Sequence, residues 1–252
     1  MDLSRGRKEE VEDYVATDRL VRLLLNGEPL LTLVATPSHL RELALGHLLG
    51  EGLLRRREEV EEVKEKGLEV HVRLRRKPSP LRHRATSTPS CGASDPAELY
   101  SKLLEEGLPR PKDTRFGAKA VSEALGSLHS STGIFRRTGG THAAALFTRE
   151  GKMEVCLEDV GRHNAVDKVL GWGLERGVDF GESFLGFTGR VPAEVVAKCL
   201  RAGIPLLASL SAPLESGINL AEAGGLTLVG FARGSRLNVY AHPERLVFDS
   251  EA

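Results

Sequence analysis

The sequence contains little cysteine, few aromatic residues and no excess of either charge. Cysteine occurs three times in 252 residues, at positions 91, 156 and 199, and aromatic residues make up 5% of the chain. Scattered thiols in an odd number exclude a disulfide framework and favour a reducing, cytoplasmic setting. Because Lys+Arg 35 balances Asp+Glu 35, the chain lacks the cation excess of a nucleic-acid binder. Any site for an anion is therefore local.

Long apolar runs are also missing. None approaches the roughly 20 residues that a membrane-spanning helix needs, and the charged start, Met1 to Glu10, differs from a secretory signal. We therefore expect no membrane partner. Hydrophobic residues still make up 40% of the chain and charged residues 28%, which is typical of a globular protein with a real core.

The N-terminal part has the pattern of a small α+β unit. Asn26-Gly27 and Lys66-Gly67 are tight-turn signals between alternating runs, and they predict two hairpins. Thr36-Pro37 predicts the start of a helix that ends near residues 50–52. The predicted strands cover 11–16, 19–25, 30–34, 60–64 and 68–74.

The remainder alternates between helix and strand patterns, which predicts an α/β fold with a mixed, layered sheet and functional loops at the strand ends. We expect a small N-terminal unit over 1–76, a loop over 77–96 and a larger α/β domain over 97–252. The predicted helices cover 97–106, 118–129, 162–176, 193–202 and 213–223. The predicted strands cover 143–147, 153–157, 184–187, 206–210 and 226–231.

The loop over 77–96 carries Cys91, the first candidate for chemistry. A structureless stretch of this length is usually functional or a linker. The cations at 82–84 would lower the pKa of a nearby thiol and so raise the fraction of nucleophilic thiolate. We expect Cys156, in a strand pattern, and Cys199, on an apolar helix face, to be buried and inert. Cys91 is therefore the predicted reactive thiol, with burial as the alternative.

Four segments place glycine beside hydroxyl, imidazole or guanidinium groups. Glycine lets a backbone approach a ligand closely, and a helix N-terminus attracts phosphate. An aromatic ring with two guanidinium groups can stack on a base and hold its phosphates. Plain turns and capped helices with solvated arginines are the alternatives. The candidate binding residues are Gly139, Gly140, Thr141, His142, His163, Thr188, Gly189, Arg190, Phe231, Ala232, Arg233, Gly234, Ser235 and Arg236.

Two metal sites are alternatives for these residues. His142 would be the first ligand of a zinc deaminase, but Ala144 stands where the proton-shuttling Glu belongs, and no P-C-x-x-C follows. A metal held by Asp159, His163 and Asp167 has no spacing specific to a known site. Since His163 and Asp167 lie four residues apart on one helix face, they are alternatively expected to satisfy each other. We expect no intrinsic metal.

Two of the segments together resemble the FdhD/NarQ family of formate dehydrogenase accessory proteins. The resemblance rests on residues 139–147 and on the specific string E-D-V-G-R-H-N-A-V-D-K at 158–168. Shorter matches at 187–190, 209–213 and 230–233 follow in the family's order. The likeness extends over most of the chain.

This resemblance implies a sulfurtransferase that acts as a sulfur carrier. Such a protein accepts persulfide sulfur from a cysteine desulfurase and passes it to bis(molybdopterin guanine dinucleotide), containing molybdenum or tungsten, before the cofactor enters formate dehydrogenase. The resemblance also implies a homodimer and a larger domain similar to the cytidine deaminase fold. By the same resemblance, Cys91 matches the persulfide carrier and 231–236 the cofactor-binding segment. The alternative is a non-catalytic chaperone that binds the molybdenum cofactor.

One position departs from the family pattern. Ser94 stands where many members have the second cysteine of a C-x-x-C motif. A persulfide on Cys91 therefore cannot be discharged by a thiol at position 94. Transfer through a single cysteine remains feasible, with Ser94 donating a hydrogen bond to the thiolate.

Overall fold

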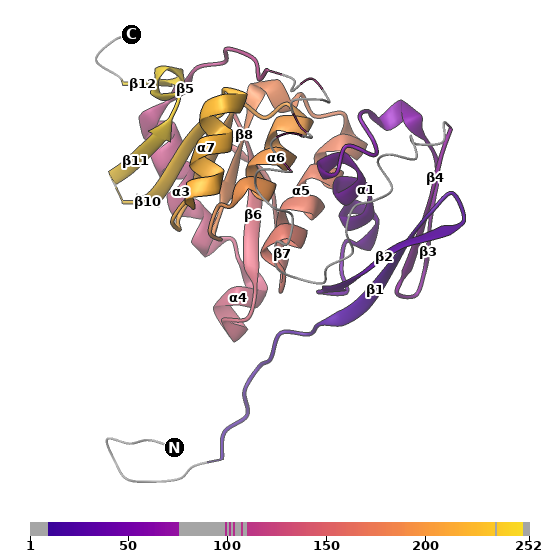
Figure 1. Ribbon diagram of the computed structural model, residues 1–252. Helices are drawn as coiled ribbons and strands as arrows, with labels where there is room; N and C mark the ends of the chain where they lie inside the picture. Colours follow the sequence, from indigo (N-terminus) through magenta and orange to yellow (C-terminus); the bar gives the residue numbers. More distant parts are fainter. Residues whose placement is uncertain are drawn as a thin grey trace.

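The computed structural model describes residues 10–75, 99, 101, 103, 107, 110–234 and 236–248. In this part of the chain a four-stranded sheet, a helical layer and a six-stranded sheet lie side by side, with α3 on the far face of the larger sheet (Figure 1). The prediction of a mixed, layered α/β fold is confirmed. The two predicted unit boundaries, Cys91, Ser94 and Ser235 lie outside the described residues.

The small sheet has the strand order β2-β1-β4-β3, in which β1 is parallel to β4 and the other pairs are antiparallel. Both predicted hairpins are present. Asn26 and Gly27 have φ angles of 52° and 89°, as a turn with two left-handed residues requires. Its strands are β1 (Arg19–Leu25), β2 (Glu28–Ala35), β3 (Val60–Lys66) and β4 (Glu69–Leu74).

Two N-terminal predictions are wrong. Residues 11–16 do not form a strand; they are extended without a sheet partner. Helix α1 (Leu40–Gly50) begins at Leu40 rather than at Pro37, because His39 has a left-handed φ of 53°. Thr36 does not cap the helix but contacts the end of β7, where its N–H donates to Asp159 Oδ2 at 3.0 Å. A tertiary contact thus replaces the helix cap that the local sequence suggested.

The large sheet has the strand order β11-β10-β9-β8-β6-β7. Strands β8, β9 and β10 are mutually parallel, whereas β6 is antiparallel to both β8 and β7. Its strands are β6 (His142–Thr148), β7 (Met153–Asp159), β8 (Ser183–Phe187), β9 (Leu206–Ser209), β10 (Thr227–Arg233) and β11 (Arg236–Ala241). This topology places the C-terminal ends of β7 to β10 and the N-terminal end of β6 at one edge.

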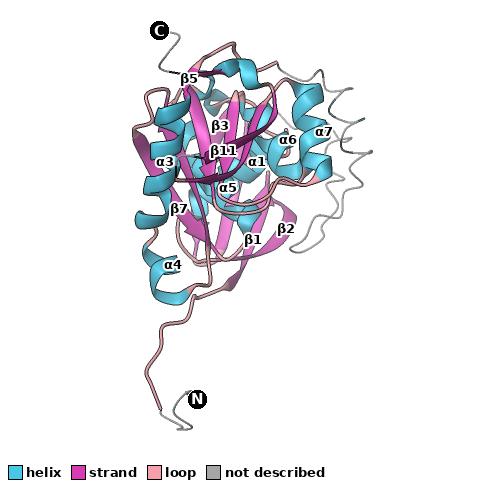
Figure 2. Cartoon of the chain, turned by 90° about the vertical axis from the view of Figure 1, so that its left-hand side faces the viewer, coloured by secondary structure: helices cyan, strands magenta, loops and turns pink. Residues whose placement is uncertain are grey.

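Helices cover both faces of this sheet (Figure 2). Ala143 and Phe147 of β6 pack with the residues under α3, while Leu146 packs with the core under α5, as the alternation of side chains along a strand requires. The helices are α3 (Ala118–Ser130), the short α4 (Gly133–Thr138), α5 (Arg162–Arg176), α6 (Ala193–Ala202) and α7 (Glu215–Gly224). Smaller elements are β5 (Phe116–Gly117), β12 (Leu246–Val247) and the 3-10 turns η1 (Arg57–Glu59), η3 (Phe180–Glu182) and η4 (Pro243–Arg245).

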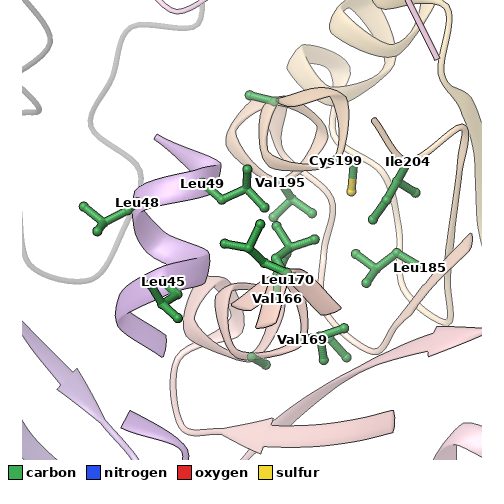
Figure 3. Packing of buried hydrophobic residues seen from close by; sticks show 14 of the residues in the cluster. Leu45, Leu48, Leu49, Val166, Val169, Leu170, Leu185, Val195, Cys199 and Ile204 are labelled. Carbon is green, nitrogen blue, oxygen red and sulfur yellow. The ribbon is translucent and has the colours of Figure 1, made fainter. Parts of the chain in front are cut away.

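Helix α1 joins the two sheets by packing directly on α5. At their crossing Gly46 faces Gly171, and a Cβ on Gly171 would overlap the carbonyl oxygen of Glu42. Figure 3 shows Leu45 and Leu49 of α1 beside Val166 and Leu170 of α5. One continuous core therefore fixes α1 against the helix that leads away from the sheet edge. No helix in the described ranges is long and apolar enough to cross a membrane.

Candidate functional site

The predicted binding segments meet at the shared edge of the large sheet. Strand pairing sets His142 opposite Asp159 and Ala144 opposite Phe187, and β8 and β9 end together with Phe187 opposite Ser209. The loops after β7, β8, β9 and β10 consequently lie in sequence along this edge. Segments up to about ninety residues apart in the chain form one surface.

A set of hydroxyl groups holds the loops after β8 and β9 together. Thr188 Oγ1 accepts a hydrogen bond from Ala143 N at 2.9 Å. Ser209 Oγ donates to Gly189 O at 2.7 Å, and Ser211 Oγ donates to Thr188 O at 2.7 Å. These contacts fix the Thr188-Gly189-Arg190 turn, so its backbone is preorganised for a ligand.

This turn carries Arg190 and lies near two further basic residues, Arg162 and His142. Gly189 packs closely against Arg162: a Cβ atom added to Gly189 would lie 3.2 Å from Arg162 Cβ. Burial lowers the pKa of His142, and the charges of Arg162 and Arg190 lower it further. His142 is therefore neutral at neutral pH, and the two guanidinium groups make this part of the edge electropositive.

The end of β10 and the start of β11 form an open pocket of about 360 Å³ lined by Phe231, Arg233, Arg236 and Asn238. Phe231 is 39% exposed and has a φ of 50°, a conformation that strains a bulky residue. Arg233 Nε donates to Leu210 O at 3.3 Å, which ties the pocket to the neighbouring loop. An exposed ring beside two guanidinium groups is suited to stack on a base and to hold phosphate.

The candidate residues around this pocket differ in exposure. Arg233, Gly234 and Arg236 are exposed, whereas Ala232 is buried. Ala232 thus offers almost no surface to a ligand. Arg236 Nε donates to Asn238 Oδ1 at 3.2 Å, which orients the guanidinium along the pocket wall.

Glu158 is a residue whose role the sequence did not reveal. Its carboxylate accepts hydrogen bonds from Gly133 N, Ile134 N and Phe135 N at 2.7, 2.9 and 2.7 Å, and from Thr141 Oγ1 at 2.8 Å. It thereby caps α4 and fixes the 139–142 turn. No local signal predicts this role, because its backbone partners lie 23 to 25 residues earlier in the chain.

The start of α5 is fixed by a buried ion pair. Lys168 Nζ lies 2.7 Å from Asp159 Oδ2, and both side chains are fully buried. Asp159 Oδ1 accepts from Gly161 N at 2.8 Å and from Asn164 Nδ2 at 3.0 Å. Burial lowers the pKa of Lys168, although the charge of Asp159 opposes that shift. The ends of β7 and α5 are thus locked around the Gly161 turn.

His163 and Asp167 do not satisfy each other. Asp167 instead pairs with Lys198 Nζ at 2.8 Å and with His47 Nδ1 at 3.4 Å. Burial lowers the pKa of His163 to about 4, helped by the charges of Lys198 and Arg162, so its imidazole is neutral. Its Nε2 atom is buried without a hydrogen-bond partner among the described residues. Within the same residues no three His, Cys, Asp or Glu side chains are grouped to hold a metal ion.

The two described cysteines are poor nucleophiles, but only Cys199 is buried as predicted, since Cys156 is partly exposed. Cys199 is fully buried in the core of α6. Burial raises the pKa of each thiol, Cys156 and Cys199, to about 12. Because sulfur chemistry requires the thiolate, neither is ionised near neutral pH.

The fold and its electropositive edge define a mixed α/β protein suited to bind an anionic ligand. A model of the FdhD/NarQ family matches residues 16–247, and this chain belongs to that family. The sulfur carrier protein FdhD of Sulfolobus acidocaldarius is 37% identical over 96% of this chain and 94% of its own. That of Methanothermobacter thermautotrophicus is 36% identical, covering 95% of this chain and 94% of its own.

A solved structure has the same fold. It is described as that of a candidate formate dehydrogenase accessory protein from Desulfotalea psychrophila. The two chains superpose with a TM-score of 0.79 at 28% identity, over 95% of this chain and 93% of the other. The family resemblance predicted from the motifs is therefore confirmed, whereas the likeness to the cytidine deaminase fold stays a prediction.

Proposed function

We propose that this chain is a sulfur carrier for formate dehydrogenase. Cys91 accepts the terminal sulfur of a persulfide on a cysteine desulfurase, and the desulfurase cysteine leaves as a thiolate. The S–S bond of the Cys91 persulfide then breaks, Cys91 leaves as a thiolate, and the outer sulfur passes to bis(molybdopterin guanine dinucleotide), the substrate, whose metal supplies the electron pair of the new bond. The names of the relatives, sulfur carrier protein FdhD, support the general role.

The observation that carries this proposal is the state of the other two thiols. The chain has three cysteines, and the pKa of both Cys156 and Cys199 is raised to about 12. A carrier thiol must ionise and must be reached by two large partners in turn. Cys156 and Cys199 fail the first condition, and buried Cys199 also fails the second, which leaves Cys91 as the candidate.

The electropositive edge supplies the second half of the proposal. In it, Phe231 stacks on a guanine base, while Arg233 and Arg236 hold the attached phosphates. The turn at Thr188, with Arg162 and Arg190 beside it, holds the second anionic half of the substrate. These groups fit a nucleotide diphosphate, because they combine an aromatic face with several guanidinium groups.

Cys91→Ala tests the sulfur role. We expect this variant to fold and to bind guanine nucleotide like the original chain, yet to leave formate dehydrogenase inactive. Cys156→Ala is the matched control, because it also removes one thiol but is expected to retain activation. Full activation by Cys91→Ala would end the proposal.

A non-catalytic chaperone for the cofactor is the second candidate. It is favoured by the pocket lined by Phe231, Arg233 and Arg236, because an aromatic ring and guanidinium groups can hold a nucleotide without a thiol. A chaperone predicts normal activation by Cys91→Ala and loss of activation by Arg233→Ala. Sulfur transfer predicts loss of activation in both variants, so the pair of measurements separates the two functions.

We further propose that the protein acts as a homodimer.

A further inference from the structure

Residues 10–16, called the arm below, extend away from the body of the molecule (Figures 1 and 2). Val11 and Val15 are 77% and 88% exposed, and Tyr14 is 62% exposed. Within the described residues no backbone hydrogen bond joins the arm to the rest of the chain. The arm is thus an extended, partly apolar segment with free donors and acceptors.

Two contacts connect the arm to the turn that precedes β6. The Arg137 guanidinium of α4 lies 4.0 Å from the centre of the Tyr14 ring. A Cβ on Gly140 would lie 2.8 Å from Ala16 Cβ, so Ala16 rests directly on that glycine. The arm therefore meets the chain at Gly140, one of the predicted binding residues.

These contacts are too few to hold the arm in a single chain. Fixing the backbone of each residue has an entropic cost, and one exposed cation–π contact with one small apolar contact does not offset that cost for the whole arm. Val11 and Val15 gain nothing from the contacts that exist, because both are almost fully exposed. A second surface is needed to cover them.

Charge identifies that surface. The arm carries Glu10, Glu12 and Asp13 and no cation, whereas α4 carries the exposed cations Arg136 and Arg137 and no acidic residue. The chain as a whole is neutral, so each copy offers an acidic arm and a basic receiving surface. A second copy of the same chain has both complements in place.

We propose that two copies exchange arms, so that Tyr14 and Ala16 of one copy contact Arg137 and Gly140 of the other. Thr17 and Asp18 form the hinge between the arm and β1. The exchange repeats the Tyr14 and Ala16 contacts seen within one chain. It also brings the two arms to the side where the copies meet, so that Val11 and Val15 can be covered by the second copy rather than by their own chain. It rests on the homodimer proposed above and gives each copy a residue at the other's binding edge.

Cross-linking between two different chains tests the exchange. Asp13→Cys and Arg136→Cys are introduced into separate chains with Cys91→Ser, and the mixture is treated with a short bismaleimide. We expect a covalent dimer that contains one chain of each kind, and none when either variant is treated alone. No dimer in the mixture, with an intrachain cross-link when both cysteines share one chain, would overturn the proposal.

Sedimentation of the full chain gives a second measurement. Val11→Ser with Val15→Ser is expected to raise the dimer dissociation constant by roughly tenfold or more. Leu68→Ser, at another exposed apolar residue, is the control and should leave it unchanged. An unchanged constant in the arm variant, or a wild-type chain that stays monomeric, would contradict arm exchange. Activation of formate dehydrogenase by Cys91-containing chains is a separate readout, so its outcome distinguishes this proposal from sulfur transfer.

Discussion

Asp159 and Lys168 form a fully buried ion pair, 2.7 Å long, between the end of β7 and the second turn of α5. Lys168 Nζ also donates to Thr36 O at 3.0 Å and to Glu158 O at 3.2 Å. The pair therefore connects three segments: the residue that follows β2, the end of β7, and α5. Through Gly161 it also sets the start of α5, where Arg162 and His163 lie.

Removing the cation of this pair should destabilise the protein strongly. Lys168→Met leaves Asp159 buried without its counter-charge, which costs about 3 to 5 kcal/mol. Chemical denaturation measures the loss. Lys119→Met, on an exposed position of α3, is the control and should stay within about 0.5 kcal/mol. Equal stability of the two variants would show that the pair does not hold the edge.

The helix crossing gives a prediction about glycine. Gly171→Ala places a methyl group on the Glu42 carbonyl oxygen, so α1 must move away from α5, and we expect a loss of about 3 kcal/mol or more. Gly126→Ala in α3 meets no atom within 4 Å and should stabilise by about 0.5 to 1 kcal/mol. Thermal unfolding of both proteins checks the prediction. A tolerated Gly171→Ala would contradict the close contact of the helices.

Glu51 should make the free energy of unfolding fall as the pH becomes acidic. Burial alone would raise its pKa, but Lys198, His47 and Arg201 lower it from 4.5 to about 2. A carboxyl with a lowered folded pKa contributes stability that is complete above pH 4.5 and is lost as the pH falls toward 2. The contribution is about 3 kcal/mol.

Denaturation at a series of pH values tests this assignment. Glu51→Gln should be less stable at neutral pH and should lose less stability than the original chain between pH 4.5 and pH 2. Glu154→Gln, at an exposed position of β7, should follow the original profile. Parallel profiles for Glu51→Gln and the original chain would show that Glu51 does not cause the loss of stability at acidic pH.

Replacing Phe231 should change the free energy of unfolding and the affinity for nucleotide in opposite directions. Its φ of 50° costs a bulky residue about 1 to 2 kcal/mol, and glycine removes that strain. Phe231→Gly should therefore hold or raise the free energy of unfolding, while guanosine diphosphate binding weakens by roughly 1 to 3 kcal/mol. Calorimetric titration measures the affinity.

Arginine variants separate the pocket from general charge effects. Arg233→Ala should weaken guanosine diphosphate binding by roughly 1.5 to 3 kcal/mol, as loss of hydrogen bonds to a charged group does. Arg55→Ala, an exposed cation after α1, should leave the affinity unchanged. Unchanged binding in both Phe231→Gly and Arg233→Ala would exclude this pocket.

Most of the fold follows from local patterns, because periodicity reports which face of an element is buried. The predicted helix over 162–176 matches α5 at both ends, and 193–202 matches α6. The arm was mistaken for a strand because its alternating residues have no neighbour in the sheet to pair with. The start of α1 was missed because Thr36 bonds to Asp159, more than a hundred residues away.

The site was predictable as a list of segments but not as a surface. Glycine, hydroxyl and arginine residues mark the loops at 139–142, 188–190 and 230–236. Their meeting at one edge depends on strand order, which local sequence does not specify. Glu158 was missed for the same reason, since its four hydrogen-bond donors come from other segments.

In the proposed function Cys91 carries the sulfur atom, and intact-protein mass spectrometry can detect that atom on the chain. The chain is incubated with a cysteine desulfurase and cysteine, then digested to locate any adduct. We predict an increase of about 32 Da, the mass of one sulfur atom, confined to the peptide that contains Cys91. No increase in mass, or an adduct that persists in Cys91→Ala, would show that Cys91 is not the sulfur carrier.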